Sequence, residues 1–210
     1  MYVHVQAGSD SSTLSSFFRR FVIPSVPTQW FDNLVHGMLQ LLLYAHTDPC
    51  NTNFVFLSDT SVPVKPFQTV YDALTSDGDR SRFCVALVDQ ANSAFGELVR
   101  TGHLTLDELP PKTWTKAEVW SALPRSHVAV LLARSSEVLN MTMRLMVGRE
   151  RSVGGAADEL VLPTLLHRWL GPDAFHTCLA PLPHGRHDNN GSTFGCCPTY
   201  LHWDDFTDRQ

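Results

Sequence analysis

The sequence of 210 residues contains no apolar run as long as a membrane-spanning helix, which needs roughly 18–20 residues. Its longest apolar stretch covers residues 38–45, and Gln40 and His46 interrupt or bound it. The N-terminus also lacks the basic, apolar and small-residue order of a signal peptide. If the full protein has a membrane anchor, we therefore expect it outside these residues.

Several catalytic and metal-binding motifs are absent as well. The chain has no CxxC, HExxH, GxSxG, Walker or GxGxxG pattern, and its ten histidines show no paired ligand spacing. These absences argue against a zinc site and a serine hydrolase. Asp77-Gly78-Asp79 matches the DxD motif that holds a metal-nucleotide in many glycosyltransferases, but it follows a predicted helix and has the composition of a turn. We therefore predict a turn here and no metal site.

Charge is scarce and slightly negative, with 18% charged residues and a net charge of -5. Such a chain has no basic footprint for nucleic acid or an anionic membrane. Any phosphate-bearing ligand would have to be held by local basic groups. The hydrophobic content of 43% is sufficient for a sizeable core. The length suits one domain, or one domain plus a small appendage, and we expect a single, partial domain over residues 1–210.

The five cysteines give an odd count, and Cys196-Cys197 are adjacent. Neighbouring cysteines rarely bond to each other because that geometry is strained, so they bond to separate partners or stay reduced. Asn140 and Asn190 begin N-x-S/T sequons, which give weak support for a secretory compartment.

Strand and helix signals alternate along the chain, which predicts an α/β fold with a mostly parallel sheet and helices on both faces. The predicted strands cover residues 2–5, 53–58, 82–88, 117–123, 175–179 and 199–203. The predicted helices cover residues 29–46, a segment from Pro66 through Leu74, a segment from Pro124 through Leu139, and residues 157–170. Between residues 88 and 111 we expect a polar connection.

Asp59 follows the apolar run 54–57 almost directly. In parallel sheets, ligands bind in the crevice at the carboxyl ends of the strands, so this carboxylate could bind a sugar hydroxyl. The alternative is a structural cap, because Ser58, Asp59 and Thr60 are all good capping residues.

Asp158 and Glu159 open a predicted helix. Asp158 suits an N-cap or a first-turn acid that complements the helix dipole. Glu159 fits that structural role less well. A glutamate at a helix start beside apolar residues can act as a general base.

Tryptophans accompany charged residues in two places. Trp114 and Trp120 flank Lys116 and Glu118, and Trp203 lies between His202 and Asp204. Aromatic rings stack on the apolar faces of sugars, so such groupings suit a carbohydrate site. Ordinary core packing is the alternative for each tryptophan.

These segments, in this order, resemble the core-2/I-branching family of N-acetylglucosaminyltransferases. Residues 2–5 resemble its I-Y-V-H-V-D strand, and residues 30–43 its W-plus-helix region. Residues 53–63 resemble F-V-L-L-S-E-S-C-I-P, with residues 67–71 continuing the likeness. Residues 114–120 resemble W-R-K-G-S-Q-W, followed by an L-x-R-x-H pattern at residues 123–127. Residues 158–166 resemble D-E-H-Y-L-P-T-L-L, and residues 199–203 resemble T-Y-V-D-W.

The resemblance implies a GT-A-like fold and an inverting, metal-independent transfer from a UDP-sugar to a glycan acceptor. It implies no cofactor, a location in the Golgi lumen and basic side chains that stabilise the departing diphosphate. Glu159 would be the base. Asp59, Asp158, Lys116, Trp120 and Trp203 would bind substrate, with Asp59 and Trp203 lining the acceptor site and Lys116 near donor or acceptor, and the donor would meet Val3, His4 and Gln6.

The chain departs from the family pattern in several places. Gln6 stands where the family usually has Asp, Leu160 and Val161 replace His and Tyr, and His202 replaces Asp. Lys116, Arg125 and Arg186 are candidates for the basic groups of the donor site. The departures support an alternative hypothesis, a non-catalytic glycan-binding relic of the same fold. A cytosolic α/β enzyme of another class would require the order of the motifs to be a coincidence.

Overall fold

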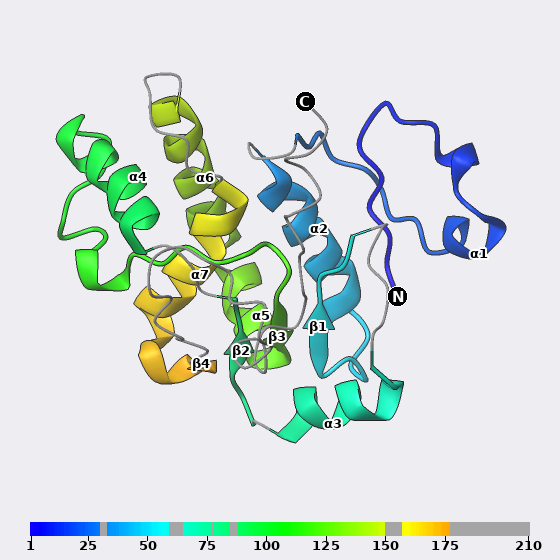
Figure 1. Ribbon diagram of the computed structural model, residues 1–210. Helices are drawn as coiled ribbons and strands as arrows, with labels where there is room; N and C mark the ends of the chain where they lie inside the picture. The colour runs from blue at the N-terminus through cyan, green and yellow to red at the C-terminus, as the bar shows by residue number, and fades with distance from the viewer. Residues whose placement is uncertain (30–32, 59–64, 77, 85–87, 150–156, 177–210) are drawn as a thin grey trace, which may run out of the picture.

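A computed structural model describes residues 1–29, 33–58, 65–76, 78–84, 88–149 and 157–176. The helices and strands of these residues alternate irregularly along the chain (Figure 1). The α-helices are α1 (Ser16–Arg19), α2 (Leu34–His46), α3 (Phe67–Ser76), α4 (Val88–Arg100), α5 (Arg125–Ala133), α6 (Ser135–Arg149) and α7 (Ala157–Leu170). Three short 3-10 helices are η1 (Ser11–Thr13), η2 (Pro111–Thr113) and η3 (Pro172–Ala174).

The strands of the described residues form one small mixed sheet. They are β1 (Asn53–Val55), β2 (Ser81–Arg82), β3 (Ala122–Pro124) and β4 (Phe175–His176), in the order β1-β3-β2-β4. β3 is antiparallel to β1, with Phe54 opposite Leu123, and antiparallel to β2, whereas β2 and β4 are parallel. The α/β class is confirmed. The mostly parallel GT-A-like arrangement stays a prediction.

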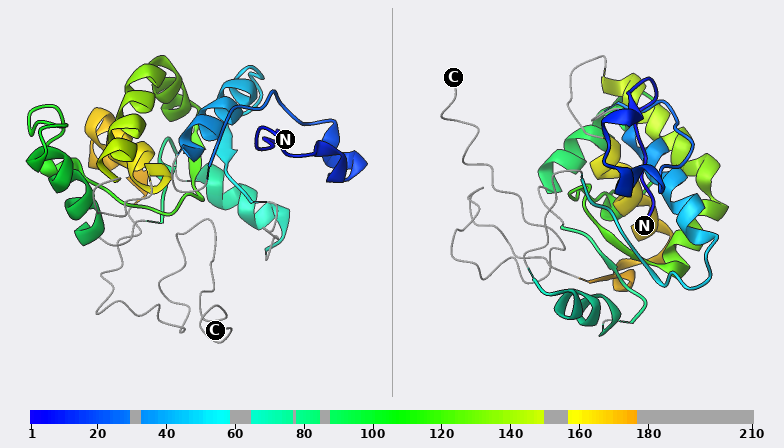
Figure 2. Two further views of the ribbon diagram at one scale, coloured as in Figure 1. Left: turned by 90° about the horizontal axis from the view of Figure 1, so that it is seen from above. Right: turned by 90° about the vertical axis from the view of Figure 1, so that its right-hand side faces the viewer.

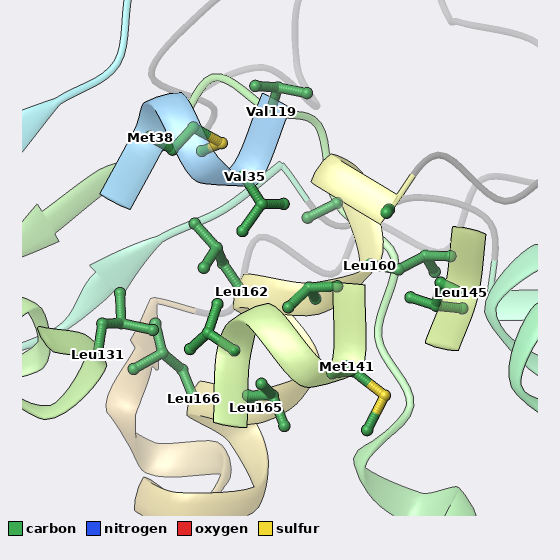
Figure 3. Packing of buried hydrophobic residues seen from close by; sticks show 14 of the residues in the cluster. Val35, Met38, Val119, Leu131, Met141, Leu145, Leu160, Leu162, Leu165 and Leu166 are labelled. Atoms are coloured by element: carbon green, nitrogen blue, oxygen red, sulfur yellow. The ribbon is translucent and has the colours of Figure 1, made fainter. Parts of the chain in front are cut away.

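The core lies where α2, α5, α6 and α7 pack together (Figures 1 and 2). Helix α7 is at its centre, since Leu160, Leu162, Leu165 and Leu166 are all at most 1% exposed (Figure 3). A helix that is apolar on all sides is stable only when other elements surround it. α5 completes the arrangement because it also contacts β1 and β3.

Arg125 holds the C-terminal end of α2. Its guanidinium donates hydrogen bonds to the carbonyl oxygens of His46, Asp48 and Asn51 at 2.8–2.9 Å. The last carbonyls of a helix have no partner within the helix, so these bonds satisfy groups that would otherwise need water or a capping residue. The contacts give Arg125 a structural role, and its proposed place in the donor site stays a prediction.

Several expected elements differ in length. The helices at residues 67–76 and 157–170 are as expected, but α2 begins at Leu34 and the predicted helix after Pro124 is divided into α5 and α6. The polar connection expected after residue 88 is wrong, because these residues form α4. Its buried face consists of Ala91, Ala94, Phe95 and Leu98, an i, i+3, i+4, i+7 pattern that was present in the sequence.

The N-terminal segment pairs with the chain that follows α1. Val3 forms a parallel bridge with Val22, its N–H donating to Phe21 O and its carbonyl accepting from Ile23 N, both at 2.9 Å. The expected strand at residues 2–5 is therefore reduced to one bridge. Residues beyond His176 in the two predicted C-terminal strands lie outside the described residues.

Candidate functional site

Glu159 occupies an exceptional position in α7. The first ten residues of this helix include nine buried ones, and Glu159 is the one that reaches the surface. Its side chain is 21% exposed. The helix start carries a partial positive charge from its unpaired N–H groups, which favours a carboxylate there. The sequence thus aims one acid outward from an otherwise buried helix.

Lys116 meets this carboxylate. Its Nζ lies 2.9 Å from Glu159 Oε2, and the two side chains are 16% and 21% exposed. Because water reaches both groups only in part, their attraction is screened less than that of a surface ion pair. Residues that the sequence separates by more than forty positions are thereby brought into one polar cluster, and the roles assigned to them from the sequence stay predictions.

The main chain of the segment that carries Lys116 is hydrogen-bonded to α7, to the Glu159 carbonyl and to the Thr164 hydroxyl. The Ala117 N–H donates to the Glu159 carbonyl at 2.9 Å. One turn further along, Thr164 Oγ1 accepts from Thr115 N at 2.9 Å and donates to Thr115 O at 2.8 Å. These bonds fix the separation of the two backbones, so the ion pair has a defined geometry.

Glu118 belongs to the same cluster, although the sequence analysis did not select it as a site residue. Its N–H donates to Cys84 O at 3.0 Å. Burial raises the pKa of the Glu118 carboxyl, the nearby Glu159 raises it further, and Lys116 opposes both. The signal in the sequence was the alternation of Lys116, Glu118 and Trp120 with small or aliphatic residues.

The chain after Trp120 leads to the end of β1. Ser121 O accepts a hydrogen bond from Phe56 N at 3.0 Å, which continues the β1–β3 pairing by one step. Ser121 is five positions after Lys116 in the chain, which limits the separation of their Cα atoms to about 17 Å. The predicted acceptor residue Asp59 follows this strand but lies outside the described residues, as does Trp203.

Trp114 has a structural role. Its Nε1 donates to Leu109 O at 3.0 Å, and its ring packs against Phe95 with the ring centroids 5.7 Å apart. The alternative reading of core packing therefore holds for this tryptophan. Trp120 is half-buried and packs against the core.

Asp158 differs from its neighbour in exposure. It is 2% exposed, whereas Glu159 reaches the surface. A buried carboxylate serves the protein interior more readily than a substrate, so the position divides the acidic pair into an inner and an outer member. A substrate-binding role for Asp158 stays a prediction.

The three residues predicted for the donor lie in the N-terminal segment. Helix α2 stands between this segment and α7 (Figures 1 and 2). The ring of His4 packs against α2 at Gly37, and its Nε2 accepts from Val26 N at 3.2 Å. Gln6 is exposed in a turn. The structure thus brings Lys116 and Glu159 together, and the donor-binding role of Val3, His4 and Gln6 stays a prediction.

The described part of the DxD-like segment takes part in a turn. Gly78 has a φ of +67°, a conformation that favours glycine, and Asp79 accepts a hydrogen bond from Ser126 Oγ. Asp77 lies outside the described residues. Among those that are described, no group of three His, Cys, Asp or Glu side chains could hold a metal ion.

The comparison with known families shows the family to which the chain belongs. The family model described as "Branch: Core-2/I-Branching enzyme" matches residues 1–207. The chain belongs to this family. This membership confirms the resemblance that the motifs indicated. The core-2/I-branching enzymes are glycosyltransferases.

The chain is similar to a protein of Oryza sativa subsp. japonica named "Glycosyltransferase BC10". The two are 30% identical over 145 residues, which cover 66% of this chain and 34% of the rice protein. The chain thus spans about a third of the length of this curated relative. No solved structure matches it. None of the helices in the described residues is long and apolar enough to cross a bilayer.

Proposed function

We propose that this chain forms part of an inverting glycosyltransferase that moves a sugar of the N-acetylglucosamine type from a UDP-sugar to a hydroxyl of a glycan acceptor. Family membership and the name of the rice relative support the reaction class. The observation that carries the proposal is the Lys116–Glu159 pair at 2.9 Å on the only surface-reaching position of the first ten in α7.

In this mechanism Glu159 is the general base. Its carboxylate takes the proton of the acceptor hydroxyl, and the acceptor oxygen attacks the anomeric carbon from the face opposite the UDP group. The bond from the anomeric carbon to the UDP oxygen breaks, and UDP leaves with the electron pair. Lys116 pairs with the Glu159 carboxylate, and the start of α7 complements its negative charge, so the side chain is held at the surface.

The donor side of the proposal depends on basic side chains instead of a metal ion. Such groups stabilise the negative charge that develops on the departing diphosphate. The proposal assigns the nucleotide to the segment of Val3, His4 and Gln6, and it requires no other cofactor. The acceptor side comprises Lys116 and Trp120, together with Asp59, Asp158 and Trp203.

The compartment follows from the same proposal. Core-2/I-branching enzymes are typically secretory-pathway proteins, and we place this chain in the Golgi lumen, attached to a membrane through a segment outside these residues. Cys84 is disulfide-bonded, and disulfides persist in oxidising compartments. Cys50 is exposed and free.

The second candidate is a glycan-binding protein that has lost transfer activity. It is favoured by Gln6, which is exposed in a turn where the family usually has an aspartate. A neutral amide at this position removes a charged hydrogen-bond partner of the nucleotide. This protein would bind glycans but neither bind nor consume a UDP-sugar.

The test replaces Glu159 with Gln, which keeps the shape and removes the base. With UDP-N-acetylglucosamine and a panel of glycoside acceptors, we expect transfer to fall by about 10²–10⁴-fold. Calorimetry should show that UDP binding persists. Glu137→Gln is the matched control, because Glu137 lies in the first turn of α6 and is 49% exposed. Full activity of Glu159→Gln would refute the assignment, and glycan binding without UDP binding in the wild type would favour the second candidate.

A further inference from the structure

Burial alternates along the segment that carries Lys116. Ala117 and Val119 are 1% and 5% exposed and belong to the core. Lys116, Glu118 and Trp120 are half-buried. Lys116, Glu118 and Trp120 therefore reach the surface, while the residues between them lie in the core. Since Lys116 pairs with Glu159, Glu118 and Trp120 are the next two surface-reaching positions along the segment after the ion pair.

No donor among the described residues bonds to the Glu118 carboxyl. The hydrogen bond that Glu118 makes there is that of its backbone N–H with Cys84 O. It nevertheless lies close enough to Lys116 and Glu159 for both charges to act on it. A half-buried carboxyl without a donor loses hydration and gains little in return. A ligand with hydroxyl groups would supply the missing donor.

We propose that the Glu118 carboxyl binds a hydroxyl of the acceptor sugar, whose ring stacks on Trp120, and thereby holds the reacting hydroxyl beside Glu159. This inference rests on the proposed function. It makes Glu118 a specificity-determining residue of the acceptor site. A site built to bond one hydroxyl rejects analogues that lack it, because the polar group of the protein is then left unpaired.

The geometry also separates the roles of the two glutamates. Glu159 lies at the helix start and is paired with Lys116, whereas Glu118 is held by its backbone to Cys84 O and has no donor to its carboxyl among the described residues. Removing Glu118 should therefore weaken acceptor binding and leave the chemical step largely intact. Removing Glu159 should abolish the chemical step.

The experiment compares Glu118→Ala, Glu118→Gln and the control Glu137→Ala. Rates are measured with UDP-N-acetylglucosamine and p-nitrophenyl glycosides, including deoxy analogues of the best acceptor. We expect Glu118→Ala to raise the acceptor KM by about 10- to 100-fold, the range of a hydrogen bond to a charged group. The value of kcat and the donor KM should change by less than about 3-fold, since neither reflects this bond. Glu118→Gln should recover part of the loss.

One deoxy analogue should lose affinity in the wild type and lose no more in Glu118→Ala, which identifies the hydroxyl. An unchanged acceptor KM in Glu118→Ala, with the wild type active, would overturn the inference and leave the proposed function standing. If the wild type transfers no sugar, the proposed function fails. Calorimetric titration with the same glycosides then decides about Glu118: weaker binding by Glu118→Ala supports the inference, and equal or absent binding overturns it.

Discussion

Pro163 lies four residues after Glu159 in α7, and the Glu159 carbonyl accepts its hydrogen bond from Ala117 instead of from the helix. In a regular helix the N–H of residue 163 would donate to this carbonyl, but proline has no N–H. The vacant acceptor is the one that the Lys116 segment uses for docking. A residue that ordinarily costs a helix about 3 kcal/mol here helps to position the candidate base.

Replacing Pro163 with Ala restores the helical donor. Its N–H would compete with Ala117 for the Glu159 carbonyl, so we expect transfer activity to fall by about 3- to 10-fold, the effect of weakening one hydrogen bond of about 1 kcal/mol. Thermal stability should stay equal or rise, because alanine is the better helix former. Pro172→Ala, at the exposed start of η3, is the control and should leave activity unchanged. Equal activity in both variants would contradict the docking role.

Lys116→Met keeps the length of the side chain and removes its charge. Glu159 then loses its partner at 2.9 Å, and we expect transfer to fall by about 10- to 100-fold, with Lys116→Arg retaining more activity than Lys116→Met. Initial rates with saturating donor measure the effect. Lys112→Met, at an exposed position of η2, is the matched control. Wild-type rates in Lys116→Met would show that the ion pair has no part in catalysis.

Sequence patterns predicted those features of the fold that are locally encoded. The apolar residues of α7 and the proline before α3 signalled helices at the observed positions. The division between α5 and α6 was not foreseeable, because Arg134 leaves the helical conformation without a glycine or proline to signal it. Short strands such as β2 depend on their partners and carry little pattern of their own.

The site was predictable to a similar extent. Motif order singled out Glu159 and Lys116, but only the folded chain shows that their charged groups meet. In the sequence Arg125 was a candidate phosphate ligand, because arginine can bond either to phosphate or to carbonyl oxygens. Its three carbonyl partners become adjacent only when α2 ends beside α5. Glu118 was overlooked because a lone glutamate in a motif says nothing about burial.

Arg125→Met removes the donors to the carbonyl oxygen of His46 at the end of α2 and to those of Asp48 and Asn51 in the chain that follows. Each hydrogen bond contributes about 1 kcal/mol, so we expect the free energy of unfolding to fall by about 3 kcal/mol. Arg125→Lys should recover little, since an ammonium does not reproduce the planar fork of donors. Urea denaturation measures the loss. Arg100→Met, which removes the pair between the exposed Arg100 and Glu97, should cost much less than Arg125→Met. Comparable losses in both variants would contradict the capping role.

His127 should make stability depend on pH. It is 5% exposed, and its Nδ1 and Ser81 Oγ are joined by a hydrogen bond of 2.7 Å. Burial lowers the pKa of His127, with Asp79 opposing. The unfolded chain therefore binds a proton first, at about pH 6.5, and the free energy of unfolding falls as the pH drops below that value.

The urea midpoint of the wild type should decrease between about pH 7.5 and pH 5.5, the interval that spans the ordinary histidine pKa. His127→Gln should show a smaller decrease. Part of the slope should remain, because burial also lowers the pKa values of His4 and His167. An identical slope in His127→Gln would exclude this histidine as a source of the effect.

Gly37 and Gly96 are both helical glycines, and they should respond to alanine in opposite ways. A Cβ on Gly37 would lie 3.0 Å from Thr28 Cγ2 and 3.2 Å from the His4 ring, whereas a Cβ on Gly96 in α4 would meet no atom within 4 Å. Alanine is favoured over glycine in a helix by about 1 kcal/mol, so Gly96→Ala should raise the melting temperature. Gly37→Ala should lower it, because the N-terminal segment must move away from α2 before the methyl group fits.

The further variant His4→Ala should relieve part of the cost in a Gly37→Ala background, and this coupling in a double-mutant cycle would show that the two residues meet. If Gly37→Ala is as stable as Gly96→Ala, the close packing of His4 on α2 is wrong, and with it the position of the segment to which the nucleotide is assigned.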